Sequence, residues 1–237
     1  MASRFFDGVD DLGGLTNQSN NFDENGSYSF MAWFAVTATN QMAIVSYSSG
    51  GAINPFVMLD VNQASVGKVR YSTRTNDATQ NLDCGYAAGS GNDGKWHHVC
   101  GVKIGNTGML YLDGFLVSTS HNLTGLTTIT VNTGTIGALR RNTNTLFISG
   151  RVNGVKLFAV PLEESEIRQE MHLPGSRNIQ GRMVSLVPLH GFGTVEMDYS
   201  ADNTDKDSGL AGTTFSFASP PISGMFVAEC PMTSMVC

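Results

Sequence analysis

Residues 94–118, with the sequence GKWHHVCGVKIGNTGMLYLDGFLVS, carry the clearest structural signal in the chain. Apolar side chains alternate with polar or small ones along this stretch, and a period of two residues is typical of a β-strand. The pair Asp113-Gly114 lies between apolar flanks, and a two-residue type I′ turn needs the positive φ angles that Asp and Gly tolerate. The stretch therefore predicts strands at 96–104, 109–112 and 115–118, with a tight hairpin at Asp113-Gly114.

The alternation also assigns the side chains of strand 96–104 to two faces. One face, which we expect to be the core face, carries Trp96, His98, Cys100, Val102 and Ile104. His97 and Lys103 lie on the other face. Two adjacent strand residues point to opposite sides of a sheet and do not easily share a metal ion, so we expect a structural role for His98.

The same period of two dominates the chain up to about residue 160, and clusters of Gly, Asn, Asp and Ser separate the segments. This spacing is typical of an all-β sandwich of two antiparallel sheets. The one segment with helical character is 161–171, where a Pro and early acids suit a helix N-terminus. We expect Leu162, Ile167 and Met171 to dock this helix on an edge of the sandwich. The remaining predicted strands are 28–36, 42–47, 56–61, 68–72, 135–138 and 152–159.

Composition excludes several classes of protein. The 237 residues include only 14 Lys and Arg and carry a net charge of −6. Binding to nucleic acid needs a clustered basic face, and the only adjacent basic pair, Arg140-Arg141, is typical of a solvated loop. No apolar run approaches the roughly 18 residues of a membrane span. The N-terminus lacks the pattern of a signal peptide, so we expect the protein to stay in the cytosol that made it or to leave by lysis.

The four cysteines show no zinc-binding spacing. Cys84 and Cys100 are symmetric about Asn92, so a hairpin at residues 90–94 would place them opposite each other. A cross-strand disulfide is one alternative. Free, buried thiols are favoured, because no export signal precedes them.

Seven motifs follow one another along the chain, at residues 6–11, 28–34, 94–99, 110–114, 136–137, 147–152 and 162–167. Together they resemble the laminin G-like branch of the concanavalin A-like jelly rolls, over residues 4–172. The resemblance implies a two-sheet antiparallel jelly roll with a binding or adhesive role, often toward glycans or protein partners. Asn153-Gly154 departs from the family pattern, yet we expect a continuous strand there. Some family members bind calcium at the rim of the sandwich. The resemblance implies that Asp10 and Asp11, or Asp93, would help to bind it here.

The superfamily also includes glycoside hydrolases, which need two suitably spaced carboxyl groups. Glu196 and Asp198 are the only such pair on an extended segment, and Ala201 replaces the third acid of the hydrolase pattern. We expect no enzyme activity and a solvated loop at this position. The acidic stretch 202–209 is similar to a calcium loop, but no bidentate Glu follows and Lys206 intervenes, so a soluble loop is favoured.

Residues 173–237 form a C-terminal extension whose motifs resemble a tail found in phage-encoded proteins. Much of it is apolar and needs a partner. It either packs back on the sandwich as an extra strand, which is favoured, or reaches another subunit by strand addition. The candidate assembly residues are Phe215, Phe217, Pro220, Pro221, Ile222 and Phe226.

These observations support two functional hypotheses. The first is a non-enzymatic structural or adhesive protein of a phage particle, on the capsid or the tail, made in the host cytoplasm and associating with itself and with other virion proteins. The alternative is a carbohydrate-binding module of a bacterial surface or secreted system. Sugars stack on aromatic rings; Trp33 and Trp96 are expected in the core, so the candidate platforms are Tyr47, Tyr71, Tyr86 and Tyr199.

Overall fold

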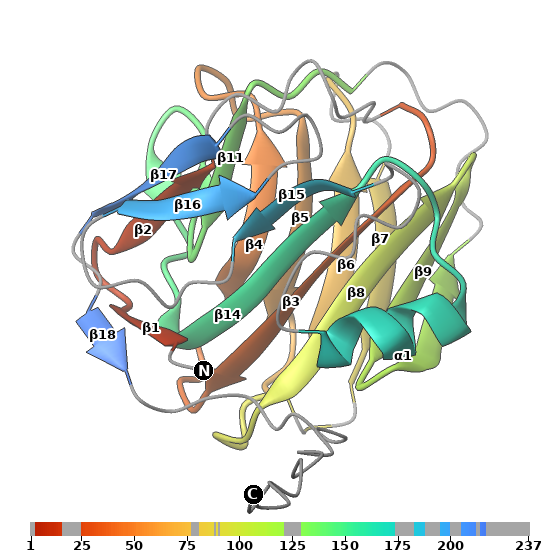
Figure 1. Cartoon of the computed structure of the whole chain (residues 1–237), viewed down its shortest axis with the longest axis horizontal. Helices are drawn as coiled ribbons and strands as arrows, with labels where there is room; N and C mark the ends of the chain where they lie inside the picture. Colours follow the sequence, from red (N-terminus) through yellow and green to blue (C-terminus); the bar gives the residue numbers. More distant parts are fainter. Residues whose placement is uncertain are drawn as a thin grey trace, which may run out of the picture.

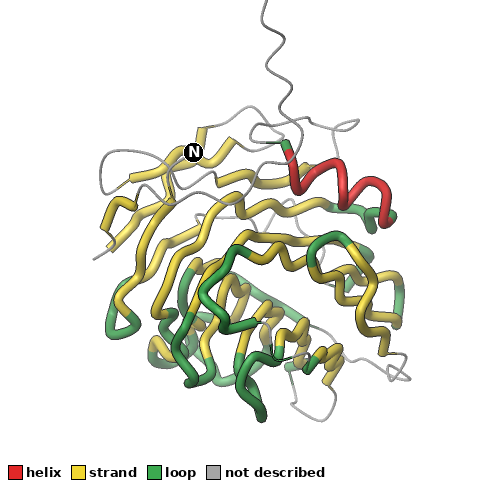
Figure 2. Tube along the Cα trace, turned by 90° about the horizontal axis from the view of Figure 1, so that it is seen from below, coloured by secondary structure: helices red, strands yellow, loops and turns green. Residues whose placement is uncertain are grey.

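The computed structural model describes residues 3–15, 25–76, 81–87, 89, 91–120 and 129–173, together with the backbone of strands β15 to β18 beyond them. Two large antiparallel sheets face each other as curved layers, and one short helix lies outside the first of them (Figures 1 and 2). The protein is therefore the all-β sandwich that the alternating pattern predicted, with the jelly-roll architecture that the family resemblance implied. Within the described residues, no helix is long and apolar enough to cross a membrane.

The first sheet has the order β10-β9-β8-β3-β14-β1-β18, and β15 also pairs with β14. Its bounds are β1 Ser3–Asp7, β3 Tyr28–Val36, β8 His97–Ile104, β9 Thr107–Leu112, β10 Phe115–Ser120, β14 Ser149–Phe158, β15 Met183–Val187 and β18 Thr214–Ser216.

The second sheet has the order β16-β17-β2-β11-β4-β5-β6-β7, and a small hairpin of β12 and β13 pairs separately. Its bounds are β2 Leu12–Leu15, β4 Met42–Ser48, β5 Phe56–Val61, β6 Val69–Arg74, β7 Asn81–Tyr86, β11 Thr133–Ile136, β16 Val195–Tyr199 and β17 Asp205–Ala211; the hairpin strands are β12 Leu139–Arg140 and β13 Asn144–Thr145.

The main core fills the space between the two sheets with aromatic and aliphatic side chains. Tyr28 of the first sheet and Tyr71 of the second join their buried hydroxyl groups across the core at 2.8 Å. The Tyr71 ring packs so closely on Gly101 that a Cβ atom there would come within 2.8 Å of it. A side chain at position 101 would therefore push the two sheets apart.

Helix α1 (Glu164–His172) packs on the outer face of the first sheet, with Glu163 and Glu166 forming a capping box at its start. Its buried Ile167 forms an apolar cluster with residues of the sheet below it, including Cys100 and Val102. The prediction that this row of β8 faces the main core is thus wrong: Val99, on the opposite face, contributes to it. The helix also covers a sheet face rather than an edge. Both sides of β8 are buried, so the alternation alone does not tell which side is the interior.

A buried ion pair fastens the helix to the sheet. Lys156 of β14 donates hydrogen bonds of 2.8 Å to both the carboxylate and the backbone carbonyl of Glu170. A third bond of 3.1 Å runs to the carbonyl of Leu173, just beyond the helix. The lysine therefore caps the helix C-terminus from below, where a positive charge is favourable.

Two local predictions are confirmed. Asp113 and Gly114 have φ values of 52° and 82°, as a type I′ turn requires. Strand β14 continues through Asn153-Gly154 as a bulge, in which Gly154 adopts a φ of 57°. The extra residue is absorbed there without ending the strand.

The cysteine predictions have mixed outcomes. Cys84 and Cys100 are free and buried, as expected. No hairpin joins them, however, because Cys84 lies in β7 of the second sheet and Cys100 in β8 of the first. The segment between them crosses from one sheet to the other, so a cross-strand disulfide is excluded.

Backbone segments of the C-terminal extension pair with both sheets. Strand β15 pairs with β14, β18 pairs with β1, and β17 pairs with β2. The prediction of loops at Glu196 to Asp198 and at Asp205 to Asp207 is wrong, because these residues form β16 and β17 at the end of the second sheet (Figure 1). Edge pairing provides the hydrogen bonds that hold these polar segments as strands.

Candidate functional site

A cavity of about 270 Å³ lies on the outer face of the second sheet. Strands β5, β6 and β7 form its floor, and the segment containing β12 and β13 forms one wall. Its residues come from distant parts of the chain, and the sheet register explains how they meet.

Alternation along the strands selects which side chains reach the floor. The inner row of β5 and β6, which includes Leu59 and Tyr71, belongs to the core. The outer row consists of three cross-strand pairs, and directly opposed side chains of this kind interact. These pairs are Phe56 with Arg74, Met58 with Ser72, and Asp60 with Arg70.

The wall is held against the sheet by polar and apolar contacts. Ser46 donates a 2.9 Å hydrogen bond to the carbonyl of Ala138, and Ser48 donates one to the carbonyl of Arg140. Leu139 is buried against Phe56 and the neighbouring apolar side chains of the floor. The wall is therefore a fixed part of the fold, which places Arg141 beside the cavity.

One end of the cavity carries a compact network of ion pairs. The Arg70 guanidinium bonds to both carboxylate oxygens of Asp60, at 2.9 and 2.7 Å, and to Asp83 at 3.0 Å. Gln41 donates a further bond of 2.7 Å to Asp60. Burial raises the pKa of Asp60, while the bonds and charge of Arg70 oppose that shift. The charge of Arg70 is therefore more than compensated, and this end of the cavity is acidic.

Two further arginines gather at the other end around one aromatic ring. The guanidinium carbons of Arg74 and Arg141 lie 5.7 and 6.0 Å from the centroid of Phe56. These distances allow cation–π attraction, which orients a guanidinium group. Burial, and then the positive charge of Arg74, lower the pKa of Arg141. Two like charges are thus held close together at this end.

Ser72 lies between these two ends. It is only 3% exposed, and its Oγ has no hydrogen-bond partner within the described part of the protein. A buried hydroxyl without a partner costs about 1–3 kcal/mol. Such a group in a cavity is well suited to bond a ligand that enters.

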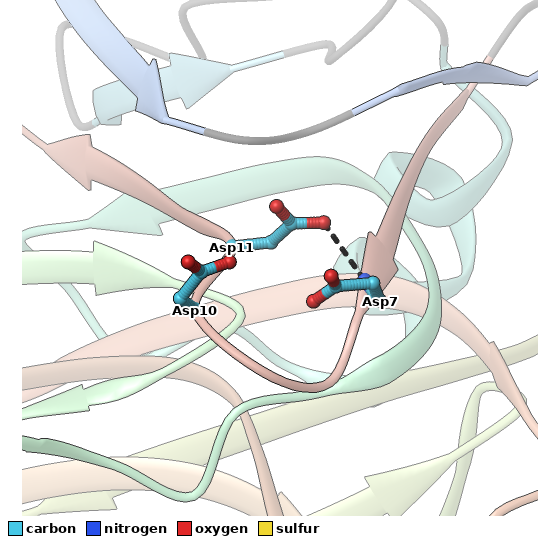
Figure 3. A group of neighbouring side chains, drawn as sticks. All are labelled: Asp7, Asp10 and Asp11. Carbon is cyan, nitrogen blue, oxygen red and sulfur yellow. Dashed lines mark hydrogen bonds between the residues drawn. The ribbon is translucent and has the colours of Figure 1, made fainter.

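The turn between β1 and β2 holds a second group of chemically interesting residues. The carboxylates of Asp7, Asp10 and Asp11 have oxygen atoms within 4.8 Å of one another (Figure 3). Asp11 accepts a 2.8 Å bond from the backbone N–H of Asp7. Burial raises the pKa of Asp11, and the charges of its two neighbours raise it further.

This turn includes one of the calcium alternatives expected from the sequence. Oxygen donors with three negative charges fit a hard cation such as calcium, and Asp7 joins the expected Asp10 and Asp11. Asp93, the other alternative, instead bonds to His97 at 3.2 Å and to Lys95 at 3.3 Å. His97 also bonds to Asp113 at 2.8 Å, so two carboxylates occupy its ring nitrogens.

The predicted aromatic platforms are mostly buried. Tyr47 and Tyr71 are 2% and 0% exposed, so they are core residues rather than platforms. Tyr86 packs partly against the core, and the side chain of Tyr199 lies outside the described residues. Trp33 is buried as expected, but Trp96 is half-buried.

Among the candidate assembly residues, Phe215 lies in β18, opposite Arg4 of β1. The others, Phe217, Pro220, Pro221, Ile222 and Phe226, lie outside the described residues. Their role in assembly, like the division of the chain at residue 172, stays a prediction.

Sequence reasoning missed the residues of the cavity. Arg141 belongs to the basic pair that indicated a solvated loop, and that description suits only the exposed Arg140. The available signal was the polar row Arg70, Ser72 and Arg74, which alternates with core residues along β6.

Comparisons with known proteins agree with this architecture. The family model Laminin_G_3, described as the Concanavalin A-like lectin/glucanases superfamily, matches residues 7–168. No curated protein sequence matches the chain.

Solved structures with a similar fold include several lectin-like proteins. A Bacteroides ovatus protein for which carbohydrate binding is proposed has a TM-score of 0.62 at 14% identity, covering 93% of this chain and 61% of its own. The CBM40 of a Ruminococcus gnavus sialidase, bound to α2,3 sialyllactose, has a TM-score of 0.50 at 18% identity, over 61% and 82% of the chains. A heptameric pentraxin from Limulus polyphemus has a TM-score of 0.52 at 16% identity, over 70% and 80%.

At these identities the structural neighbours show the fold. The match of the family model, which spans more than half of the chain, shows the family. The protein belongs to the Laminin_G_3 family of the concanavalin A-like lectin/glucanases superfamily.

Proposed function

We propose that the protein is a non-enzymatic carbohydrate-binding protein whose ligand enters the cavity on the outer face of the second sheet. The observation that carries this proposal is the buried hydroxyl of Ser72, which has no hydrogen-bond partner among the described residues and lies inside a preformed cavity. Carbohydrate-binding proteins among the structural neighbours support the same function.

The lining of the cavity suits the two kinds of surface that a sugar presents. The half-buried side chain of Leu146 offers apolar area to the C–H groups of a pyranose ring. Arg70, Asp83 and Ser72 offer donors and acceptors to its hydroxyl groups. A few polar groups on an apolar background are typical of a small-molecule site.

The size of the cavity limits what enters it. Its volume of about 270 Å³ is just below the range of roughly 300–1,000 Å³ found for pockets that hold drug-sized ligands. We expect one sugar residue inside, with the rest of an oligosaccharide in solvent. The site therefore recognises a single residue or a chain end.

A glycan array followed by titration calorimetry tests the proposal. Ser72→Val removes the hydroxyl and keeps a side chain that suits a strand, so affinity for any glycan bound by the natural protein should fall at least tenfold. Ser65→Val, at an exposed loop position, is the matched control and should bind as the natural protein does. No binding to any glycan, or unchanged binding in Ser72→Val, would overturn the proposal.

The role in a phage particle remains a prediction from the resemblance of the C-terminal extension. It does not conflict with carbohydrate binding, because an adhesive particle protein also needs a ligand site. Purified particles that contain the protein, detected by mass spectrometry, would support that setting; particles that lack it would argue against it.

A further inference from the structure

We propose that the ligand of this cavity carries an anionic group, a sugar carboxylate or sulfate, which Arg74 and Arg141 bind together. The inference rests on the proposed function and adds the chemical class of the ligand. It starts from the arrangement of charges within the cavity.

The two ends of the cavity differ in how their charges are arranged. Arg70 is held between the carboxylates of Asp60 and Asp83, which compensate its charge. At the opposite end, Arg74 and Arg141 converge on the ring of Phe56. An anion between the two guanidinium groups would relieve their mutual repulsion, and a neutral hydroxyl would not.

The donors of the two arginines suit an anion with several oxygens. A guanidinium has five N–H donors, and Arg141 uses one of them in a 3.4 Å bond to the carbonyl of Ile53. Carboxylates and sulfates accept paired bonds from the planar edge of a guanidinium. The Ser72 hydroxyl, two residues from Arg74 on the same side of β6, is placed to bond a neighbouring oxygen of the same sugar.

The acidic end gives the ligand a direction. Asp83 lines the cavity and its side chain is 44% exposed, so it repels a second anion and accepts bonds from neutral hydroxyl groups. An acidic sugar would enter with its charged group toward Phe56 and its hydroxyls toward Asp83. The protein's net charge of −6 disfavours long polyanions, so we expect short acidic glycans or chain ends.

Paired probes test the requirement for an anion. We would titrate the full chain with 3′-sialyllactose and with lactose, which differ by one carboxylated sugar, and with a sulfated chondroitin disaccharide and its unsulfated form. At least one anionic member should bind tenfold or more tightly than its neutral partner, and its affinity should fall as salt is raised. The pair that shows this preference tells a carboxylate ligand from a sulfate ligand.

A pair of adjacent arginines provides the matched variants. Arg141→Ala should lower the affinity for the anionic probe roughly 10- to 100-fold, because a charge-assisted bond is lost. Arg140→Ala removes the same charge one residue away, on an exposed side chain outside the cavity lining. Its affinity for the anionic probe should stay within twofold of that of the natural protein. Arg141→Lys keeps the charge without the planar fork and should fall between them.

The outcomes separate this inference from the proposed function. Neutral glycans that bind as well as anionic ones, with Ser72→Val defective and Arg141→Ala unaffected, would overturn the anionic ligand and leave carbohydrate binding in place. Equal losses in Arg140→Ala and Arg141→Ala would show a general charge effect and would also overturn it. No binding to any glycan would overturn the proposed function itself.

Discussion

Removing the carboxylate that faces Lys156 should strongly destabilise the fold. In Glu170→Gln the Lys156 ammonium group loses its only charged partner among the described residues, and it stays buried between the helix and the sheet. The two side chains are 4% and 0% exposed, and Nζ lies 2.8 Å from the carboxylate. Breaking one side of such a buried pair costs about 3–5 kcal/mol. That is a large share of the free energy of unfolding of a typical domain, which is roughly 5–15 kcal/mol.

Urea unfolding, followed by tryptophan fluorescence, measures this loss. Glu164→Gln on the same helix is the matched control, because its pair with Arg168 has side chains that are 42% and 46% exposed. The free energy of unfolding of the control should fall by less than about 1 kcal/mol. Replacing both buried partners, as in Lys156→Met with Glu170→Leu, should restore at least half of the loss.

Two results would refute this reasoning. A loss below about 1 kcal/mol in Glu170→Gln would mean that the pair is solvated and does not anchor the helix. A double variant no more stable than Glu170→Gln would mean that side-chain shape, rather than an uncompensated charge, limits stability.

Three further predictions follow from the packing and charges. Gly101→Val should cost at least about 1–3 kcal/mol in urea unfolding, because its side chain meets the Tyr71 ring between the sheets. The bond to Asp113 raises the pKa of His97 above 6.5, despite partial burial. The stability that protonated His97 contributes is present below about pH 6.5 and is lost as pH rises through the pKa of the folded state. The difference in free energy of unfolding between the natural protein and His97→Ala should therefore narrow toward pH 9. Burial raises the pKa of Cys84 to about 12, so its thiol should react with Ellman's reagent only after unfolding.

Each of these predictions has a contrary outcome. Gly51→Ala, where a Cβ meets no atom within 4 Å, is the control for the glycine, and equal losses at both positions would contradict steric crowding. A stability gap at His97 that does not change with pH would exclude protonation as its source. Rapid labelling of Cys84 in the native protein, followed by mass spectrometry, would show that the site is open.

Local patterns predicted much of the fold because turn residues separate clear strands. Strands β3 and β5 have the predicted bounds Tyr28–Val36 and Phe56–Val61. Strand β7, Asn81–Tyr86, was missed because its polar composition is typical of a loop. Its place comes from pairing with β6, and a single strand does not reveal its partner.

The candidate site was harder to predict, because its residues meet only after folding. Phe56, Ser72 and Arg74 share a face through the register of β5 and β6. Arg141 joins them because the segment containing β12 folds back over the sheet, held by Ser46 and Ser48. No local period encodes that return, so the basic pair at 140–141 resembled an ordinary loop.

A crystal structure of the protein with the tightest-binding glycan would test the central claim most directly. We predict a sugar residue above β5 and β6, with Ser72 Oγ and the Arg141 guanidinium within hydrogen-bond distance of its oxygen atoms. A glycan bound at the turn of Asp7, Asp10 and Asp11, or on any other surface, with the cavity empty, would contradict it.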